Sequence, residues 1–375
     1  MPKLKILVIN WQDINNPSGG GAEVHLHEIF SRIAKMGHRV DLFCCEVDGM
    51  PQRETVDGIN IIRKGSRNLF NYYVPIWYKK YFSKENYDII IDDINKIPFY
   101  TPLYVKEPVL AISHHFFGKS IFREAGFIPG SYVYISEKLI DLIYKKTPFA
   151  VVSRSTLNEF LDRGFSRKYF EIVQNAIHKD DFPMAVGDKY EAPTVSYFGR
   201  LKKYKSVDHL FHAFASIEKE IPGARLEILG KGDFRPYLEE LTGRLGIERS
   251  TLFHGFVSEE DKKMLLSKAW CVVNTSMKEG WGITNIEANA CGTPVISANV
   301  PGLKDSVKPG KSGLLYQYGN IEELAAQIKD VLLNKKLRHQ LNDGAVKWAS
   351  EFSWDDSAEK MLSLIESIIS GRFPS

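Results

Sequence analysis

Short apolar segments alternate with longer amphipathic segments along the whole chain. In the first half, apolar segments bounded by turn residues are typical of buried parallel strands, at residues 5–10, 40–43, 59–62, 88–91, 109–112, 150–152 and 171–173. A second series covers residues 194–198, 226–229, 251–253, 271–274, 294–297 and 313–316. Most intervals are long enough for a helix that connects two parallel strands. The pattern therefore predicts an α/β protein with two doubly wound sheets.

The segment between the two series is polar, bounded by prolines and without a clear period, which is typical of an interdomain linker. We therefore expect an N-terminal domain over 1–182, a linker over 183–193 and a C-terminal domain over 194–353. A chain of 375 residues is long enough for two such domains. Residues 354–369 carry apolar positions at helical spacing, so the final helix (354–375) must pack on a partner, for which the first domain is a candidate.

Composition and charge argue against several classes of function. The chain is 44% hydrophobic and 25% charged, as in folded soluble proteins, and its net charge of +3 without a basic stripe argues against nucleic acid as a partner. No apolar run has the roughly 18–20 residues of a membrane span, and the N-terminus leads directly into a strand, so we expect a cytoplasmic protein. The four cysteines lack disulfide or metal-site spacing.

The stretch EGWGITNIE (279–287) follows the predicted strand at 271–274 and opens a helix. A helix N-terminus at the carboxyl end of a strand offers amide groups and a positive dipole to phosphate, and Gly280 and Gly282 allow the backbone to approach a diphosphate. Two structural alternatives remain: Thr284 and Glu287 fit a capping box, and the glycines fit a simple turn.

The loop GRLKKYK (199–205) ends another strand of the same predicted sheet. Its Arg200 and Lys205 are candidates for binding a diphosphate, the guanidinium through paired hydrogen bonds and the ammonium as a point charge. A charged loop by itself is more often solvated surface. Because both loops end strands of one sheet, we favour a shared ligand site.

Two features of the first domain suggest a second group of functional residues. GGGAE (19–23) precedes an amphipathic helix, and its glycines allow backbone contact with a phosphate or a sugar, although a flexible surface loop is the alternative. His114 and His115 follow the strand at 109–112, and one imidazole is a candidate for positioning a reacting hydroxyl or phosphate. The adjacent histidines do not have the spacing of a metal site.

Two further segments have competing interpretations. Asp92 and Asp93 resemble a carboxylate pair for a metal, but a turn at the end of a strand is the preferred interpretation. Residues 68–84 mix aromatic residues with lysines. This segment is either an acceptor wall or membrane-surface patch, or an ordinary packed helix that follows Pro75.

Taken together, GGGAE, the strand ending in two histidines, GRLKKYK and EGWGITNIEANACGTPVI resemble glycosyltransferase family 4. The last motif matches the E-x7-E signature, and the motifs occur in the expected order over nearly the whole chain. The supporting matches are VQN at 173–175, LGKGDFRPYLEEL at 229–241, HGFVSEED at 254–261 and PGLKDSV at 301–307. The resemblance implies the GT-B fold, in which two Rossmann-like domains face each other across a deep cleft. It also implies transfer of a sugar from a nucleotide-sugar donor with retention of configuration.

The resemblance also assigns roles to individual residues. Arg200 and Lys205 would hold the donor diphosphate and stabilise the leaving group, Glu279 would contact sugar hydroxyls and Glu287 would bind the ribose. The remaining implied contacts are the phosphate-capping amides of Gly282, Ile283, Thr284 and Asn285, the phosphate approach of Gly20 and Gly21, and His114 beside the donor sugar. Further candidates within the same motifs are Glu23, His115, Gly230 and Val257. No cofactor or metal is implied, because the nucleotide-sugar is a substrate.

Three positions depart from the commoner family pattern. His115 stands where an aspartate is frequent, which leaves the register of the catalytic histidine open by one residue, and Ser206 and Ala176 replace glycines. A nucleotide-sugar 2-epimerase and a catalytically idle sugar-nucleotide-binding protein remain alternatives. The acceptor is a glycan, a lipid-linked sugar or a small molecule, and contact of residues 68–84 with the inner face of the membrane is a further hypothesis.

Overall fold

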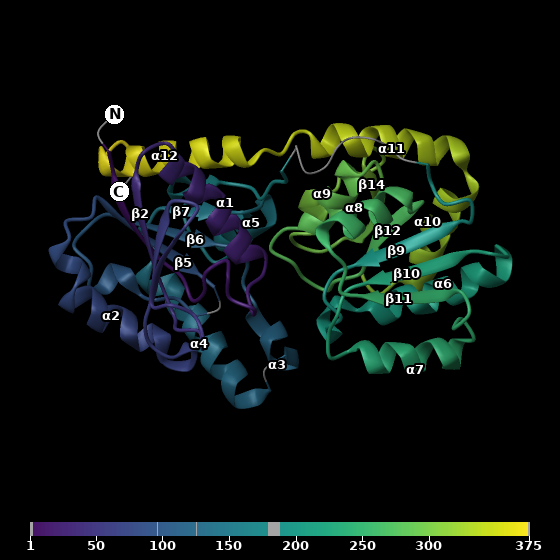
Figure 1. The fold of residues 1–375 in the computed structure, drawn as a ribbon, viewed down its shortest axis with the longest axis horizontal. Helices are drawn as coiled ribbons and strands as arrows, with labels where there is room; N and C mark the ends of the chain where they lie inside the picture. The colour runs from purple at the N-terminus through teal and green to yellow at the C-terminus, as the bar shows by residue number, and fades with distance from the viewer. Residues whose placement is uncertain (1–2, 96, 125, 179–187, 374–375) are drawn as a thin grey trace. The chain divides into compact units, whose positions relative to one another are not determined.

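The computed structural model describes residues 3–95, 97–124, 126–178 and 188–373. The chain divides into two compact units, residues 1–175 with 354–375 and residues 176–353 (Figure 1). Of the predicted linker, residues 183–187 lie outside the described residues, whereas residues 188–193 belong to the second unit. There the amide of Tyr190 donates to the carbonyl of Lys268 at 2.9 Å.

The first unit is built on a sheet of eight strands in the order β3-β4-β2-β1-β5-β6-β7-β8. Neighbouring strands are parallel except β3 and β4, which form an antiparallel pair at the edge. The strands are β1 (Lys5–Ile9), β2 (Arg39–Cys44), β3 (Arg53–Val56), β4 (Ile59–Arg63), β5 (Ile89–Ile94), β6 (Val109–Ser113), β7 (Phe149–Val151) and β8 (Phe170–Ile172). The helices are α1 (Gly21–Lys35), α2 (Phe70–Lys80), α3 (Ile121–Glu124), α4 (Phe127–Ile143), α5 (Arg154–Asp162) and α12 (Trp354–Ile369).

Strand β3 is absent from the sequence prediction. Its residues RETV alternate between exposed and half-buried, so they lack the apolar run by which the other strands are recognised. The turn to β4 is made by Asp57 and Gly58, both with positive φ (47° and 87°). An Asp-Gly pair is the usual signal of a two-residue hairpin, and that signal was present in the sequence.

The two faces of the first sheet carry different helices. Asp92 accepts a hydrogen bond from Tyr144, at the end of α4. Asp93, the next residue of β5, points to the other face and bonds His114, whose ring contacts His25 of α1. Because side chains alternate along a strand, α4 and α1 cover opposite faces. Helix α12 packs against α1, so the end of the chain belongs to the first unit (Figure 1).

The second unit is built on a fully parallel sheet of six strands in the order β11-β10-β9-β12-β13-β14. Its strands are β9 (Thr194–Phe198), β10 (Arg225–Leu229), β11 (Thr251–Gly255), β12 (Cys271–Asn274), β13 (Val295–Ala298) and β14 (Gly313–Tyr316). Its helices are α6 (Val207–Glu220), α7 (Arg235–Leu245), α8 (Glu259–Lys268), α9 (Ile283–Ala290), α10 (Ile321–Leu333) and α11 (Lys335–Ala349). The prediction of two doubly wound, mostly parallel sheets is therefore confirmed.

Each sheet contains a point where the strand order reverses. In the second unit the chain runs from β9 outward to β10 and β11 and then returns to β12, on the other side of β9. In the first unit the chain leaves β1 for β2, β3 and β4 on one side and then returns to β5, which pairs with β1 on its other side. The loops that leave two such neighbouring strands diverge and open a crevice at their carboxyl ends, where ligands bind in open α/β sheets. These two points are therefore where functional residues are expected.

Candidate functional site

In the second unit, the loops that follow β9 and β12 are hydrogen-bonded to each other. The amide of Met277 donates to the carbonyl of Tyr204 at 3.0 Å, and the hydroxyl of Thr275 donates to the carbonyl of Lys205 at 2.8 Å. The two motifs that the sequence separates by about seventy positions therefore form one surface at the point of strand reversal.

Lys205 and Glu279 form an ion pair between Nζ and Oε1 across these two loops. Their side chains are only 14% and 19% exposed. Burial lowers the pKa of Lys205, but the neighbouring Glu279 carboxylate outweighs burial, so its pKa lies above the usual 10.5. The ammonium group stays charged and keeps further N–H donors for an anionic ligand.

Arg200 is an exposed cation of this surface. Its only described side-chain contact is a long hydrogen bond of 3.5 Å from Nη2 to the hydroxyl of Tyr204. No ion pair holds the guanidinium among the residues that the structure describes, so apart from this long bond its donors are available to a ligand such as a diphosphate. Lys203, two residues before Lys205, is exposed in the same loop.

Gly230, at the end of β10, supports this loop by close backbone contact. A Cβ atom at this position would lie 1.9 Å from the carbonyl oxygen of Gly199, and the residue has a φ of 142°. The amide of Gly199 in turn donates to the carbonyl of Leu229 at 3.0 Å. Gly230, a candidate binding residue in the sequence, therefore has a visible structural role as the support of the Arg200 loop.

We predict that Gly230→Ala destabilises the second unit and weakens ligand binding at the Arg200 loop. Gly223→Ala is the matched control, because Gly223 also has a positive φ, 85°, but no atom within 4 Å of its Cβ position. Overpacking should make Gly230→Ala roughly 1–3 kcal/mol more destabilising than the control. Chemical denaturation measures both free energies of unfolding. Equal values would show that the loop can move away from the added methyl group without loss of stability, which would contradict the prediction.

Helix α9 does not begin at Thr284, as the capping-box interpretation required. Gly282 is its N-cap, which puts Thr284 inside the first turn, and the Glu287 side chain is not a cap. The capping-box interpretation of Thr284 and Glu287 is therefore wrong. The amides of Ile283 and Asn285 donate to the carbonyls of Trp281 and Gly282. Of the four amides expected to cap phosphates, those of Gly282 and Thr284 have no partner among the described residues.

The side chain of Asn285 fixes the start of α9 to the sheet. It is fully buried, and its Nδ2 donates to Ser297 of β13 at 3.2 Å and to Ser306 at 2.9 Å. Its Oδ1 accepts a hydrogen bond from Asn274 of β12 at 3.2 Å. This buried network fixes the start of α9, and with it the amides of Gly282 and Thr284, a few residues after Glu279.

Glu287, eight residues after Glu279, is also paired with a lysine. Lys262 of α8 approaches its Oε1 to 2.9 Å, and the lysine Nζ lies 5.2 Å from the centre of the Phe198 ring. Burial raises the pKa of Glu287, and the Lys262 ammonium partly offsets this effect. Lys262 was not singled out in the sequence, because its partner lies 25 positions away. Val257 is half-buried in the loop before α8.

In the first unit, His114 lies directly after β6 and is buried against Asp93. The distance from Nε2 of His114 to Oδ1 of Asp93 is 2.9 Å. Asp92 and Asp93 both lie inside β5 and are buried, so their interpretation as a strand-end turn is wrong. His115 is half-buried, and its ring packs on Phe117.

The surroundings of His114 set its charge. Burial lowers the pKa of His114, but the Asp93 carboxylate outweighs burial and the pKa lies above the usual 6.5. Burial, together with His114, lowers the pKa of the neighbouring His25 to about 3, so His25 is neutral at physiological pH. The pKa values of the two imidazoles, whose centroids are 5.3 Å apart, are therefore shifted in opposite directions.

We predict that Asp93→Asn lowers the pKa of His114, because burial lowers this pKa and only the weaker effect of the Glu23 carboxylate then opposes burial. In the wild type, the pair stabilises the fold fully below pH 6.5 and loses this contribution as the pH rises through the raised pKa. NMR titration of the imidazole measures the pKa, and His25 is an internal control that should not titrate between pH 5 and 8. An unchanged His114 titration would remove Asp93 from this role.

The glycine loop of the first unit is held in place from both ends. At its end, the carboxylate of Glu23 accepts a hydrogen bond from the amide of Gly20 at 2.7 Å and one from Asn95, after β5, at 3.2 Å. Gly21 begins α1 and is exposed. Glu23 is buried, and burial raises its pKa. Glu23 thus connects the loops after β1 and β5 at the point of strand reversal.

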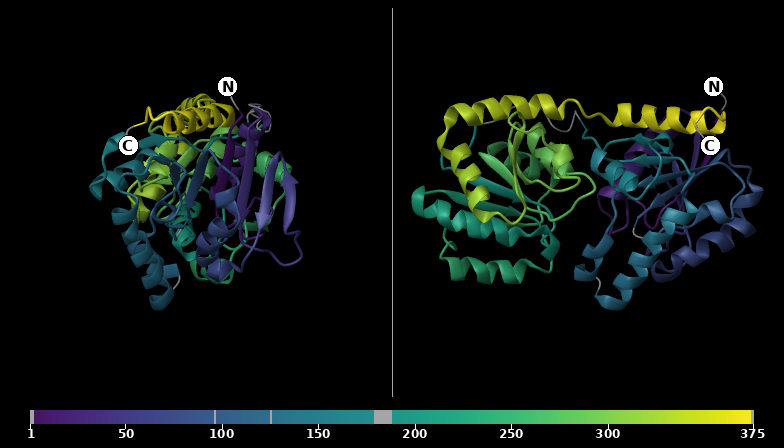
Figure 2. Two further views of the ribbon diagram at one scale, coloured as in Figure 1. Left: turned by 90° about the vertical axis from the view of Figure 1, so that its left-hand side faces the viewer. Right: turned by 180° about the vertical axis from the view of Figure 1, so that it is seen from behind.

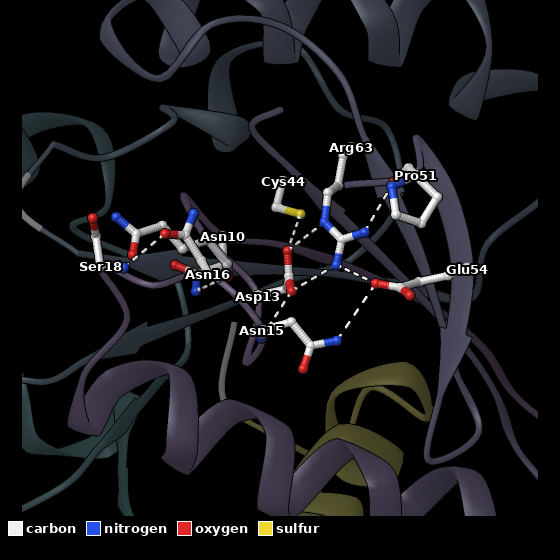
Figure 3. A network of polar contacts seen from close by, with 10 residues as sticks. Asn10, Asp13, Asn15, Asn16, Ser18, Cys44, Pro51, Glu54 and Arg63 are labelled. Atoms are coloured by element: carbon white, nitrogen blue, oxygen red, sulfur yellow. Dashed lines mark hydrogen bonds and ion pairs between the residues drawn. The ribbon is translucent and has the colours of Figure 1, made fainter. Parts of the chain in front are cut away.

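The start of the same loop is fixed by a buried ion pair (Figure 3). Arg63, the last residue of β4, donates from Nε and Nη2 to the two oxygens of Asp13 at 2.7 and 2.8 Å, and Nη2 also contacts Glu54 of β3. Asp13 in turn accepts from the amide of Asn15 at 3.0 Å. Because side chains and backbone groups hold residues 10–20 at several points, the alternative of a flexible surface loop is not supported.

Residues 68–84 form helix α2 and the turns beside it. The helix begins at Phe70, so Pro75 lies within it, and the prediction of a helix that follows Pro75 is wrong in its start. Phe70, Val74 and Tyr78 pack into the core, as expected for a packed helix. The opposite side exposes apolar residues to solvent, as expected for a surface that meets a partner.

The described part of the chain has neither a metal-binding cluster nor a membrane-spanning helix. Among the residues described, no group of three or more His, Cys, Asp or Glu side chains is arranged to hold a metal ion. Within the same described part of the chain, no helix combines the length and the apolar character needed to cross a membrane.

Family models match both units. Residues 19–181 match the model described as glycosyltransferase family 4, and residues 179–348 match the model of group 1 glycosyl transferases. An uncharacterized glycosyltransferase of Methanocaldococcus jannaschii is 26% identical over 96% of this chain and 97% of its own length. A D-inositol 3-phosphate glycosyltransferase of Jonesia denitrificans is 35% identical, over 49% of this chain and 45% of its own length.

Solved structures share the architecture. Sucrose-phosphate synthase from Thermosynechococcus elongatus superposes with a TM-score of 0.81 at 21% identity, covering 98% of this chain and all of the other. HepE from Anabaena, solved in complex with UDP-glucose, gives 0.76 at 18% identity over 97% of this chain and 100% of its own. At these identities the likeness establishes the fold, which is GT-B.

Proposed function

This chain belongs to the family 4 glycosyltransferases, and we propose that it moves a hexose-type sugar from a nucleoside-diphosphate donor to an acceptor hydroxyl with retention of configuration. The observation that carries this proposal is the joined pair of loops after β9 and β12. These loops and the first turn of α9 carry Arg200, Lys205 and the amides of Gly282 and Thr284, which have no partner among the described residues. Such a surface suits a group with two or more negative charges.

The proposed reaction is a front-face displacement. The bond between the anomeric carbon and the phosphate oxygen of the donor breaks, and the electron pair leaves with the nucleoside diphosphate. The acceptor oxygen forms its bond to the anomeric carbon on the same face, and its proton passes to the departing phosphate. Arg200 and Lys205 stabilise the negative charge that develops on the leaving group. These two cations do what a metal ion does in other transferases, so the proposed reaction is metal-independent.

The remaining residues bind and orient the substrates. Glu279, held by Lys205, accepts hydrogen bonds from sugar hydroxyls, and Glu287, held by Lys262, accepts them from the ribose. The amides of Gly282 and Thr284 donate to phosphate oxygens. In the first unit, His114 positions a reacting hydroxyl or phosphate, and its charge is supported by Asp93.

The proposal also extends to the base of the donor nucleotide and to the acceptor. The UDP-glucose bound to HepE, a protein with the same fold, makes UDP-sugars the first donors to test and GDP-sugars the second. The acceptor is a glycan, a lipid-linked sugar or a small molecule. The exposed side of α2 carries Tyr72 and Ile76 together with Lys79 and Lys80, which supports contact of residues 68–84 with a membrane surface.

The experiment that tests the proposal is a ligand screen of the full chain. Thermal shift and calorimetry are measured with UDP, GDP, ADP and their common sugar conjugates, each with magnesium and with EDTA. A ligand that binds only the folded protein raises its stability. We expect one nucleoside diphosphate to raise the melting temperature equally under both conditions. No response to any nucleotide would contradict the donor site, and a response only with magnesium would contradict metal independence.

Incubation with the donor that binds then identifies the chemistry. With an acceptor, NMR of the product should show the same anomeric configuration as the donor. Without an acceptor, the donor sugar should be unchanged apart from slow hydrolysis. Conversion of the donor to its 2-epimer would instead identify an epimerase.

A further inference from the structure

The outer side of α4 is unusually apolar for a surface helix. Its exposed residues at positions 128, 132, 135, 139 and 142 are Ile, Tyr, Ile, Leu and Leu, spaced alternately by four and three. They therefore form a continuous row along the helix, which we call the α4 row. Its N-terminal end, with Phe127 and Ile128 at 80% and 81% exposure, holds the most exposed large apolar side chains among the residues described.

A second row on α2 continues this surface. Leu69, directly before the helix, and Tyr72 and Ile76 within it are exposed at spacings of three and four. The hydroxyls of Tyr72 and Tyr132 are 3.2 Å apart, and Asn71 donates to the hydroxyl of Tyr132 at 2.9 Å. The two helices lie side by side in Figure 1 and again from behind in Figure 2. The apolar rows therefore make one patch, whereas the exposed apolar residues of the second unit are scattered over several elements.

Most of the exposed charges beside this patch are positive, and the exposed Glu85 next to Lys84 is paired with Lys5 at 2.7 Å. The exposed lysines are Lys79, Lys80, Lys84, Lys138, Lys145 and Lys146. None of the six has an ion pair with a carboxylate in the described part of the chain. Asp141 of α4 is paired with Arg163 at 2.7 Å, and Glu137 faces inward. The patch is thus apolar and aromatic at its centre and positively charged around it.

These features decide between two occupants of the patch. A second copy of the chain, related by a two-fold axis, would place this patch against itself and bring the lysines of one copy near those of the other, with few acids to pair them. An anionic lipid bilayer takes up apolar and tyrosine side chains at its interface and attracts lysines at its surface. We propose that the α2 and α4 rows together bind the surface of an anionic lipid bilayer. This inference rests on the proposed function, because it makes the acceptor one that is met at a membrane.

The inner side of α4 connects this surface to the candidate catalytic loop. The carboxylate of Glu137 accepts hydrogen bonds from the amides of Phe117 and Gly118 at 2.6 and 2.8 Å. These two residues lie two and three positions after His115. The helix that meets the bilayer is therefore the same helix that fixes the loop carrying His114, so docking brings that loop to the membrane surface together with α4.

The test uses the full chain and vesicles of phosphatidylcholine with and without 30% phosphatidylglycerol, a composition of about one anionic lipid in three as in acidic leaflets. We expect sedimentation with the anionic vesicles only. The variant I135E/L142E should weaken this binding at least about tenfold, since it places two charges in the apolar row. The matched control is L252E/L333E, which adds the same two charges to exposed apolar residues of the second unit, at 55% and 61% exposure, against 59% and 77% for Ile135 and Leu142. Circular dichroism checks that each variant is folded.

The outcomes separate this inference from the proposed function. Unchanged vesicle binding by I135E/L142E, or no binding by the wild type, would overturn the membrane surface. A wild-type dimer in light scattering that the same variant dissociates would replace the bilayer by a second copy of the chain. Nucleotide binding in solution should be equal in the wild type and I135E/L142E. Its absence from both would instead contradict the proposed function and leave the vesicle result to stand on its own.

Discussion

Replacing Arg200 by alanine is expected to lower kcat/KM for the nucleotide-sugar by about 100- to 1,000-fold, the usual effect of removing one donor to a developing oxyanion. The physical reason is the loss of paired hydrogen bonds and a positive charge at the leaving group. The melting temperature should not change, because the Arg200 side chain is exposed and, within the described part of the chain, hydrogen-bonds only Tyr204, at 3.5 Å. Steady-state kinetics and thermal unfolding measure the two quantities.

Two further variants make this prediction specific. Lys203→Ala removes another exposed cation of the same loop and should leave kcat/KM within about threefold, since surface charges away from a ligand have small effects. Arg200→Lys keeps the charge but loses the planar, paired donors, so its activity should fall between those of the wild type and Arg200→Ala. Equal activities of the wild type and Arg200→Ala would exclude Arg200 from the mechanism.

Replacing Arg63 by methionine is expected to destabilise the first unit by about 3–5 kcal/mol, because it leaves the buried Asp13 carboxylate without its partner. Arg63 is 1% exposed, and the ion pair to Asp13 is bidentate. Lys329→Met is the control, because Lys329 and its partner Glu220 are 40% and 54% exposed. The control should cost less than about 1 kcal/mol. Chemical denaturation measures both values.

The pH dependence of the Arg63→Met variant should have the opposite sign to that of the wild type. Burial raises the pKa of Asp13, but Arg63 outweighs burial and the pKa lies below the usual 3.8. The wild-type contribution is therefore present above pH 3.8 and is lost as the pH falls through the lowered pKa. Without Arg63, burial is opposed only by the smaller effects of the Asn15 amide and the Cys44 thiol, so we expect the pKa of Asp13 to be raised and the variant to lose stability as the pH rises from below 3.8. A parallel pH dependence of the two proteins would contradict this account.

Most of the fold could be predicted from the sequence, because buried parallel strands have a strong local signal. Thirteen of the strands appear as apolar runs at nearly the observed positions, whereas the charged strand β3 does not. Its place at the edge depends on pairing with β4, and its Glu54 contributes to the buried contact with Arg63. Such pairing depends on residues at different places in the chain, and no local pattern reports it.

The residues of the candidate site also fall into those that the sequence indicates and those that only the structure reveals. The motifs around Arg200, Lys205, Glu279 and Glu287 are contiguous, so the sequence is sufficient to select them and to indicate the family. Their partners are distant in sequence: Lys262 for Glu287, Asp93 for His114 and Arg63 for Asp13. These partners were missed, and Asp93 was interpreted as a turn residue, because a charged side chain in a strand shows its role only when its neighbour is known.

The sequence by itself thus determined the class of fold, the order of the strands along the chain and the residue types that a nucleotide-sugar would meet. Only the tertiary structure decided which lysine faces which carboxylate, which histidine is held by an aspartate and which side of α4 is left uncovered. The physical reason is that hydrophobic periodicity is a local property of the chain, whereas charge pairing and burial depend on the residues that folding brings together.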